Sequence, residues 1–136
     1  MASWKELVGY VEGKYLLSRL EPTWFALRWD FGRDGEPLVQ EVRVEQITAF
    51  DEPWVLCHSR ICAEVLLDSK ELLTRNAALA VGSIALVKGI YLVRQPLRLS
   101  TLCWEELDRV LLFIGREACA LMGDLERTAA WPGLLN

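Results

Sequence analysis

Apolar and polar residues follow two different periods along the chain, and the changes of period mark the predicted elements. Residues 4–17 carry apolar side chains at helical spacing, behind a capping box formed by Ser3 and Glu6. Residues 23–31 alternate with a period of two, as a half-buried strand does. The start of the chain is therefore predicted to be a helix, ended by Glu21 and Pro22, followed by a strand.

The next segment predicts a β-hairpin and a third strand. The sequence GRDGEP at 32–37 holds the glycine, aspartate and proline residues that tight turns favour. The returning strand, 38–50, is polar on one face, and a further strand follows at 54–61 after a second turn.

The apolar stretch AALAVGSIALVKG at 77–89 is too short to cross a bilayer, which takes about 20 apolar residues. Gly82 interrupts a helical interpretation, and Lys88 and Gly89 separate two β-rich runs, so the spacing predicts a hairpin. Upstream, DSKELLTRNAAL predicts a short helix capped by Asp68 or Ser69. Its inward-facing residues are expected to be Leu72, Leu73 and Leu79.

The last element is an amphipathic helix from Trp104 to about residue 126. Its apolar stripe consists of Leu107, Val110, Leu111, Ile114, Ala118, Leu121 and Leu125. Leu112 and Phe113 fall outside this stripe, which leaves two interpretations: partly covered flanks, or a second contact surface. Trp131 lies in the tail, which has no periodicity and which could dock on the domain or on a partner.

The order of elements is α-β-β-β-α-β-β-α, which predicts an α+β fold with an antiparallel sheet of about five strands packed against helices. We expect one domain over residues 1–127 and a short C-terminal tail over residues 128–136, because 136 residues suffice for one core.

Composition narrows the classes of function. With 19 acidic and 15 basic residues and a net charge of −4, the chain lacks the concentrated basic run that nucleic-acid binding favours. The N-terminus is too charged for a signal peptide, so we expect a cytoplasmic protein without a membrane segment. A hydrophobic content of 52% with six tryptophans indicates more apolar surface than one small core needs.

Catalytic and metal-binding patterns are not found in the sequence. His58 is flanked by Cys57 and Ser59, but neighbours on one strand point to opposite faces, so neither is easily activated by the imidazole. Glu105 and Glu106 open the last helix, where carboxylates favour the helix dipole without a catalytic role. No phosphate loop, dinucleotide motif or zinc motif is present, and the cysteines are expected to be free thiols. We therefore expect neither an enzyme nor a cofactor or metal.

The passage LLTRNAALAVGSIALVKGIYLVRQPLRLSTLCWEELDRVLLFIGREACAL resembles the second half of the type III secretion chaperone-like superfamily, in its YbjN-type branch. The motifs that carry the resemblance are Leu-x-x-x-Asn ending at Asn76, the glycine turn at Gly89 and the Glu-Glu-Leu that begins the last helix. The resemblance covers residues 66–126, and the first half is similar in topology. Relatives often place Ser-Pro before the Glu-Glu pair, where this chain has Cys103 and Trp104.

The resemblance implies a small acidic homodimer without catalytic activity that binds another protein, as secretion chaperones hold an extended client on hydrophobic patches. The excess of apolar residues independently favours a protein-binding module, chaperone-like or adaptor-like. The partner-binding residues predicted are Trp29, Trp54, Leu112, Phe113 and Trp131, although Trp29 and Trp54 could equally belong to the core. Two alternatives stay open: an assembly or regulatory subunit of a larger complex, and a small-molecule binding domain with Tyr10, Trp24 and Trp54 as aromatic walls.

Overall fold

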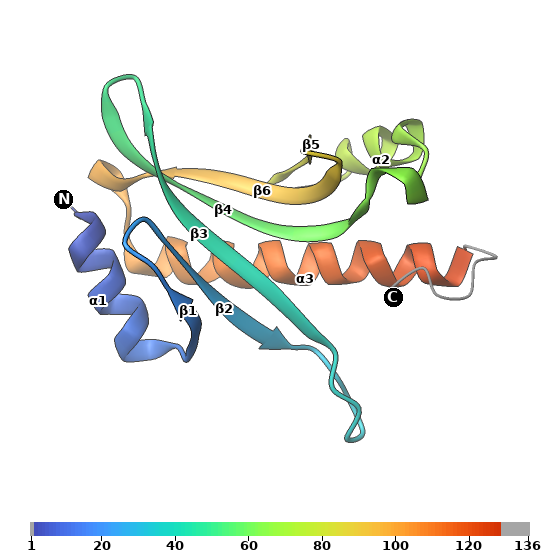
Figure 1. Cartoon of the computed structure of the whole chain (residues 1–136), viewed down its shortest axis with the longest axis horizontal. Helices are drawn as coiled ribbons and strands as arrows, with labels where there is room; N and C mark the ends of the chain where they lie inside the picture. Colours follow the sequence, from blue (N-terminus) through green and yellow to red (C-terminus); the bar gives the residue numbers. More distant parts are fainter. Residues whose placement is uncertain (1, 129–136) are drawn as a thin grey trace.

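The computed structural model of the chain describes residues 2–128, with side chains up to residue 124. Trp131 and all of the predicted tail except residue 128 lie outside the described residues. The elements are α1 (Trp4–Lys14), β1 (Leu17–Leu20), β2 (Trp24–Asp30), β3 (Val39–Ala49), β4 (Glu52–Ala63), η1 (Glu64–Leu66), α2 (Ser69–Asn76), β5 (Ser83–Val87), β6 (Ile90–Arg98), η2 (Leu99–Thr101) and α3 (Trp104–Thr128). The fold is α+β, as the sequence predicts, with the elements arranged as in Figure 1.

The strands form one antiparallel sheet in the order β1-β2-β3-β4-β6-β5. Its six strands exceed the expected five, because the chain leaves the helical conformation at Tyr15 and residues 17–20 pair with β2. The predicted helix 4–17 therefore ends at Lys14. The four residues of β1 are too few to show a period of their own, so the helical pattern before them extends over them.

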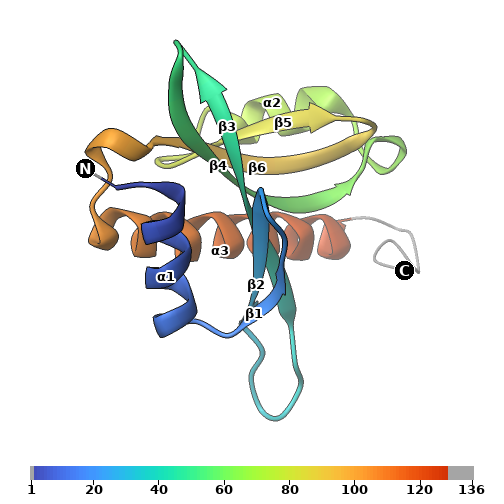
Figure 2. The same cartoon turned by 60° about the vertical axis from the view of Figure 1, so that its left-hand side comes forward.

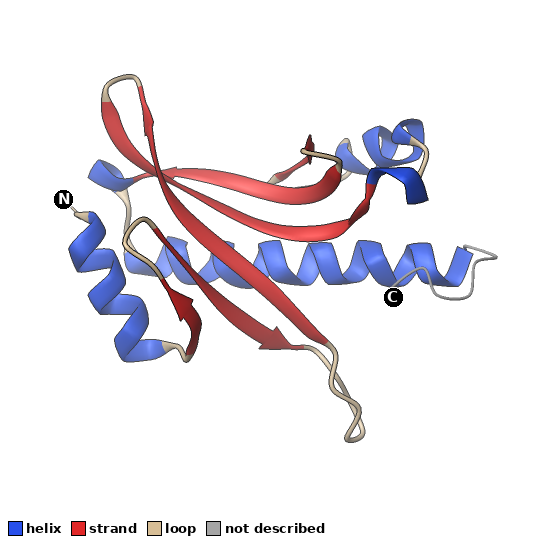
Figure 3. Cartoon of the chain, viewed as in Figure 1, coloured by secondary structure: helices blue, strands red, loops and turns tan. Residues whose placement is uncertain are grey.

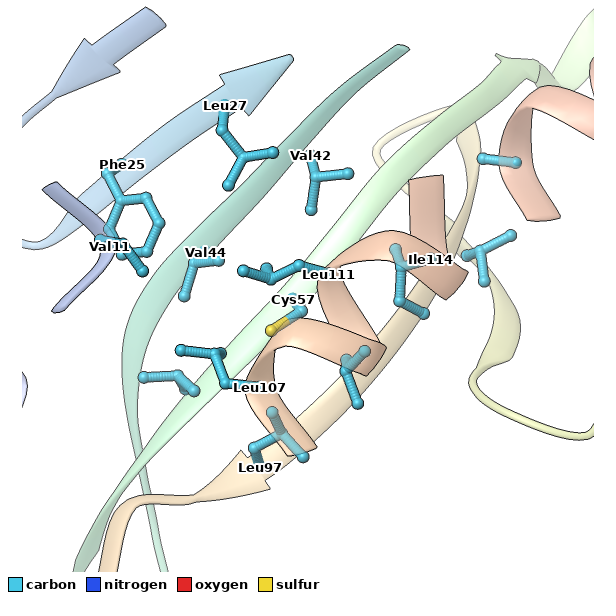
Figure 4. Packing of buried hydrophobic residues seen from close by; sticks show 14 of the residues in the cluster. Val11, Phe25, Leu27, Val42, Val44, Cys57, Leu97, Leu107, Leu111 and Ile114 are labelled. Atoms are coloured by element: carbon cyan, nitrogen blue, oxygen red, sulfur yellow. The ribbon is translucent and has the colours of Figure 1, made fainter. Parts of the chain in front are cut away.

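The helix α3 runs along one side of the sheet, α1 lies at the end where α3 begins, and α2 lies beside β5 (Figures 1 and 2). Figure 3 shows that the β2–β3 and β3–β4 hairpins reach beyond the helices. The six described residues of the predicted α3 stripe are all buried, and they meet the inward-facing residues of β2, β3, β4 and β6. Figure 4 shows this core, where Phe25, Leu27, Val42 and Val44 face Leu107, Leu111 and Ile114.

The local signals in the sequence are confirmed where they depend on a cap or a turn. The Ser3 hydroxyl accepts a hydrogen bond from the Glu6 amide at 3.2 Å, and the Asp68 carboxylate accepts one from the Lys70 amide at 3.0 Å. Lys88 and Gly89 both have positive φ, as a two-residue turn between β5 and β6 requires. One expectation is wrong: Leu73 is 67% exposed, because α2 buries only Leu72 at the sheet.

Gly115 allows α3 to lie close to the sheet. A Cβ at this position would lie 2.8 Å from Cδ1 of Trp29 and 3.0 Å from Cγ2 of Val42. The indole of Trp29 also donates a hydrogen bond to the carbonyl of Leu111 at 3.0 Å. These contacts set the distance between α3 and the strands β2 and β3.

Candidate protein-binding surface

No helix of the described residues packs on the sheet face opposite α3, and we call it the open face. Antiparallel pairing places these side chains on it: Arg19, Trp24, Ala26, Arg28, Asp30, Val39, Glu41, Arg43, Glu45, Ile47, Ala49, Glu52, Trp54, Leu56, His58, Arg60, Ser83, Ala85, Val87, Ile90, Leu92, Arg94, Pro96 and Arg98. A sheet face that meets water usually carries polar side chains. This one mixes apolar residues with arginines, which is the composition of a contact surface.

The charges on the open face differ in sign from those of the whole chain. The face holds six arginines against four carboxylates, those of Asp30, Glu41, Glu45 and Glu52, whereas the protein has a net charge of −4. Arg98 is paired with Glu52 through two hydrogen bonds of 2.5 Å. Arg28, Arg60 and Arg94 have no carboxylate partner in the part of the chain whose side chains are described. The open face is therefore the basic side of an acidic protein.

Trp24 is held by arginine side chains instead of presenting a free ring. The guanidinium of Arg43 lies 3.9 Å from the centroid of the indole, and that of Arg19 lies 5.3 Å from it. Cation–π contacts of this kind fix the ring and the arginines together. The ring of Trp24 is therefore part of the sheet surface together with Arg43 and Arg19.

Trp54 and His58 lie on the open face with one polar atom each that is buried without a partner. These atoms are Nε1 of Trp54 and Nδ1 of His58, and no described group accepts from or donates to them. Burial lowers the pKa of His58, Glu45 raises it, and Arg43 and Arg94 lower it further. The imidazole is thus held neutral, with Nε2 3.6 Å from Oε1 of Glu45.

The sheet splits at the edge of the open face. The pairing of β3 with β4 ends at Arg43 and His58, so residues 39–42 pair with β2 alone and residues 59–63 pair with β6 alone. Figure 1 shows the two strands diverging from this point. A hollow of about 620 Å³ opens between them and reaches Met122 of α3.

A second hollow, of about 440 Å³, lies on the helix side between α3, β6 and the segment before β5. Phe113 lines it with Val81, Leu97 and Val110, and the guanidinium of Arg116 lies 4.7 Å from the centroid of the Phe113 ring. Phe113 is half-buried and belongs to the rim of this hollow.

The four predicted partner-binding residues that the structure describes are not brought together. Trp54 lies on the open face, whereas Trp29 lies beneath α3, bonded to it and in edge contact with Tyr15. Leu112 and Phe113 are half-buried on α3, on the far side of the sheet from Trp54. A single contact surface cannot include all four, and their binding role stays a prediction.

The aromatic walls proposed for a small-molecule pocket are separated in the same way. Tyr10 is stacked on Trp104 at 4.7 Å between α1 and α3, while Trp24 and Trp54 lie on the open face. Sequence reasoning places Arg28 on the polar face of its strand but did not gather the arginines of this face into one surface. Their signal was the period of two in β2, β3 and β4, which places Arg28, Arg43 and Arg60 on one side.

Asp108 is the most heavily bonded carboxylate among the described side chains. It accepts hydrogen bonds from the hydroxyl of Tyr10 at 2.5 Å, from the hydroxyl of Tyr15 and from Nζ of Lys14 at 2.6 Å. Although partial burial raises the pKa of Asp108, the bonds from Lys14 and the two tyrosines lower it by more. The cluster joins α1 to α3, so we assign it to the stability of the fold.

Among residues 2–124, no group of three potential ligand side chains lies together as a metal site would require. None of the helices in the described part of the chain combines the length and the apolar run of a membrane span. The four cysteines are free thiols, with Cys57 buried and Cys103 exposed.

No protein-family model matches the chain, and no curated protein matches its sequence.

Proposed function

We propose that the protein is a non-enzymatic protein-binding module, chaperone-like or adaptor-like, that holds a partner polypeptide on the open face of its sheet. The observation that carries this proposal is the composition of that face. The half-buried side chains of Trp54, Leu56 and Ile47 share this face with unpaired arginines, and no described helix packs on it. An apolar centre supplies contact area, and charges around it select the partner.

The fold supports the same proposal by analogy. The elements after β1 follow the order that the resemblance to secretion chaperone-like proteins of the YbjN-type branch implies. Such a fold does not itself define an activity. The resemblance adds the expectation of a homodimer, and the free thiols, one of them exposed, suit the reducing conditions of the cytoplasm.

The experiment compares partner capture by matched charge reversals on the two sides of the molecule. Arg94→Glu changes the open face, and Arg116→Glu changes an exposed position on α3. Each variant is immobilised beside the wild-type protein, and the proteins retained from the native lysate are quantified by mass spectrometry. We expect Arg94→Glu to lose a partner that Arg116→Glu retains.

Two other results would contradict the proposal. A partner lost only with Phe113→Asp would place binding at the hollow on the helix side. Equal retention by all variants and by an unrelated control protein would mean that no specific partner binds the open face. The thermal unfolding midpoint of every variant is measured first, so that loss of binding is not confused with unfolding.

A further inference from the structure

We propose that the hollow between β3 and β4 is a binding site for an amphipathic monoanion, a small molecule with one anionic group and an extended apolar body. The hollow is defined by the residues at which the two strands diverge, and we call it the split-sheet hollow. This inference goes beyond the proposed function, because it concerns a small ligand, and the hollow shares Arg60 with the open face.

Two buried polar residues form hydrogen bonds at the place where the strands β3 and β4 diverge. Gln40 and Ser59 are the two buried polar residues in the part of the chain whose side chains are described. Gln40 Nε2 donates to the Ser59 hydroxyl at 2.7 Å and to the Arg60 carbonyl at 2.8 Å. The Ser59 hydroxyl in turn donates to the Glu41 carbonyl at 2.6 Å.

These hydrogen bonds have a clear physical role. Where strands separate, backbone groups lose their ladder partners, and a buried backbone group without a partner is destabilising. Gln40 and Ser59 supply bonds to two carbonyls that face the gap, so the strands stay apart without that penalty. Apolar residues at both positions would favour closure of the gap. The hollow is therefore a maintained feature of this sheet.

The wall of the split-sheet hollow is mainly apolar, and its mouth is cationic. The apolar lining consists of Val39, Val87, Ile90, Leu92 and Met122. Val39 and Val87 are exposed large hydrophobic residues, so this lining meets solvent as it stands. An apolar body placed there would remove this surface from water. A volume of about 620 Å³ is in the range of small-molecule sites, which span about 300–1,000 Å³.

The charges at the mouth favour an anion. Arg60 and Lys88 line the hollow, and neither has a carboxylate partner among the described side chains. Arg43 also lines it, with its guanidinium stacked on Trp24 and 3.7 Å from Oε1 of Glu41. Glu41 is the single carboxylate that lines the hollow among the described side chains, so these residues give its mouth an excess of positive charge in an acidic protein. Arginine and lysine together bind carboxylate and phosphate groups.

The test uses three amphiphiles with the same decyl chain: decanoate, decyl phosphate and decyltrimethylammonium. Binding to the wild-type chain is measured by titration calorimetry below each critical micelle concentration. We expect saturable one-to-one binding of at least one anion, with the cation about tenfold weaker or more. Comparison of the carboxylate with the phosphate then identifies the preferred head group.

Three variants locate the site. Arg60→Gln combined with Lys88→Gln removes the two unpaired cations and should weaken anion binding by about 3–10-fold. Val39→Trp fills the hollow from an exposed position and should abolish binding while the unfolding midpoint is kept. Arg28→Gln is the matched control, because Arg28 lies on the open face outside the hollow and its loss should leave the affinity unchanged.

Several outcomes would overturn the proposal. Equal affinity for the anions and the cation would show non-specific apolar binding, and unchanged affinity in Val39→Trp would place the ligand elsewhere. Absence of binding to all three probes would remove the site. A peptide of alternating glutamate and leucine that displaced decanoate at lower concentration would show that the occupant is a polypeptide instead of a small molecule.

Discussion

At the scale of single residues, His58 shows how neighbours on the open face set a protonation state. It lies directly between Arg43 on β3 and Arg94 on β6, and its side chain is half-buried. Burial and the two guanidinium groups disfavour the imidazolium, and they outweigh the carboxylates of Glu45 and Glu41. The pKa of His58 is therefore below its ordinary value of 6.5.

This lowered pKa predicts a pH-dependent stability. As the pH falls through about 6.5, the unfolded chain takes up a proton at His58 that the folded protein binds only at lower pH, so the free energy of unfolding decreases. Urea unfolding of the wild type and of His58→Gln is compared at about pH 7.5 and about pH 5. We expect a smaller decrease in the variant. Three carboxylates with a lowered pKa titrate below the pH range compared here, namely Asp30, Glu52 and Asp108. An equal decrease in the free energy of unfolding of both proteins would contradict the assignment of the effect to His58.

Asp108 gives a second prediction at this scale. Replacing it with Asn removes the charge that accepts hydrogen bonds from Tyr15 and Lys14, so the attachment of α1 to α3 weakens. Because hydrogen bonds to charged groups are stronger than neutral ones, we expect Asp108→Asn to lower the free energy of unfolding by about 1–3 kcal/mol. Chemical denaturation provides the measurement. Glu105→Gln, an exposed carboxylate on the same helix, should change stability little, and a similar loss in both variants would argue against a specific role for Asp108.

At the scale of elements, glycine residues with different surroundings predict opposite effects of one substitution. Gly115→Ala places a Cβ against Trp29 and Val42 and should destabilise the protein by about 1–3 kcal/mol, since α3 must move away from the sheet. Gly9→Ala, on exposed α1 with no heavy atom within 4 Å of the new Cβ, should stabilise it by about 0.5–1 kcal/mol. Thermal unfolding measures both. Stabilisation by Gly115→Ala would show that α3 lies farther from the sheet than these contacts indicate.

The elements also show how far the sequence determines the fold. Caps, turns and the α3 stripe could be predicted because each depends on residues within a few positions of one another, such as Ser3 with Glu6 or Lys88 with Gly89. The strand β1 could not, since residues 17–20 become a strand only through pairing with β2. The split between β3 and β4 also escaped prediction, because Gln40 and Ser59 meet across 19 positions of sequence.

At the scale of the whole molecule, the two edges of the sheet differ in what they expose. The edge at β1 has four residues and ends at the turn where the indole of Trp4 donates to the Pro22 carbonyl at 3.1 Å. The edge at β5 lies beside η1 and α2: the Glu64 amide donates to the Gly89 carbonyl, and the Ile84 amide donates to the Asn76 side chain. Exposed Val65, Leu73 and Leu86 lie on these three elements, which we call the β5 edge patch, whereas Val87 points to the open face.

The β5 edge patch is where we expect the proposed homodimer to form. An edge strand that has one strand neighbour and is flanked by exposed apolar side chains is the kind of surface that contacts a second copy, and one self-complementary patch suffices for a two-fold dimer. Light scattering with size-exclusion chromatography should give twice the chain mass for the wild type. Leu73→Asp with Leu86→Lys should give the monomer, because both side chains would be buried between the two copies.

Phe50→Asp is the control for this prediction. Phe50 is 89% exposed at the tip between β3 and β4, outside the patch, so its replacement removes an equally apolar side chain without touching the β5 edge. The Phe50→Asp variant should remain a dimer. If it became monomeric while the double variant did not, the tip of the β3–β4 hairpin would be the contact between copies. If the wild type were a monomer, the proposed function would no longer include a homodimer. Each partner would then bind the open face of one chain.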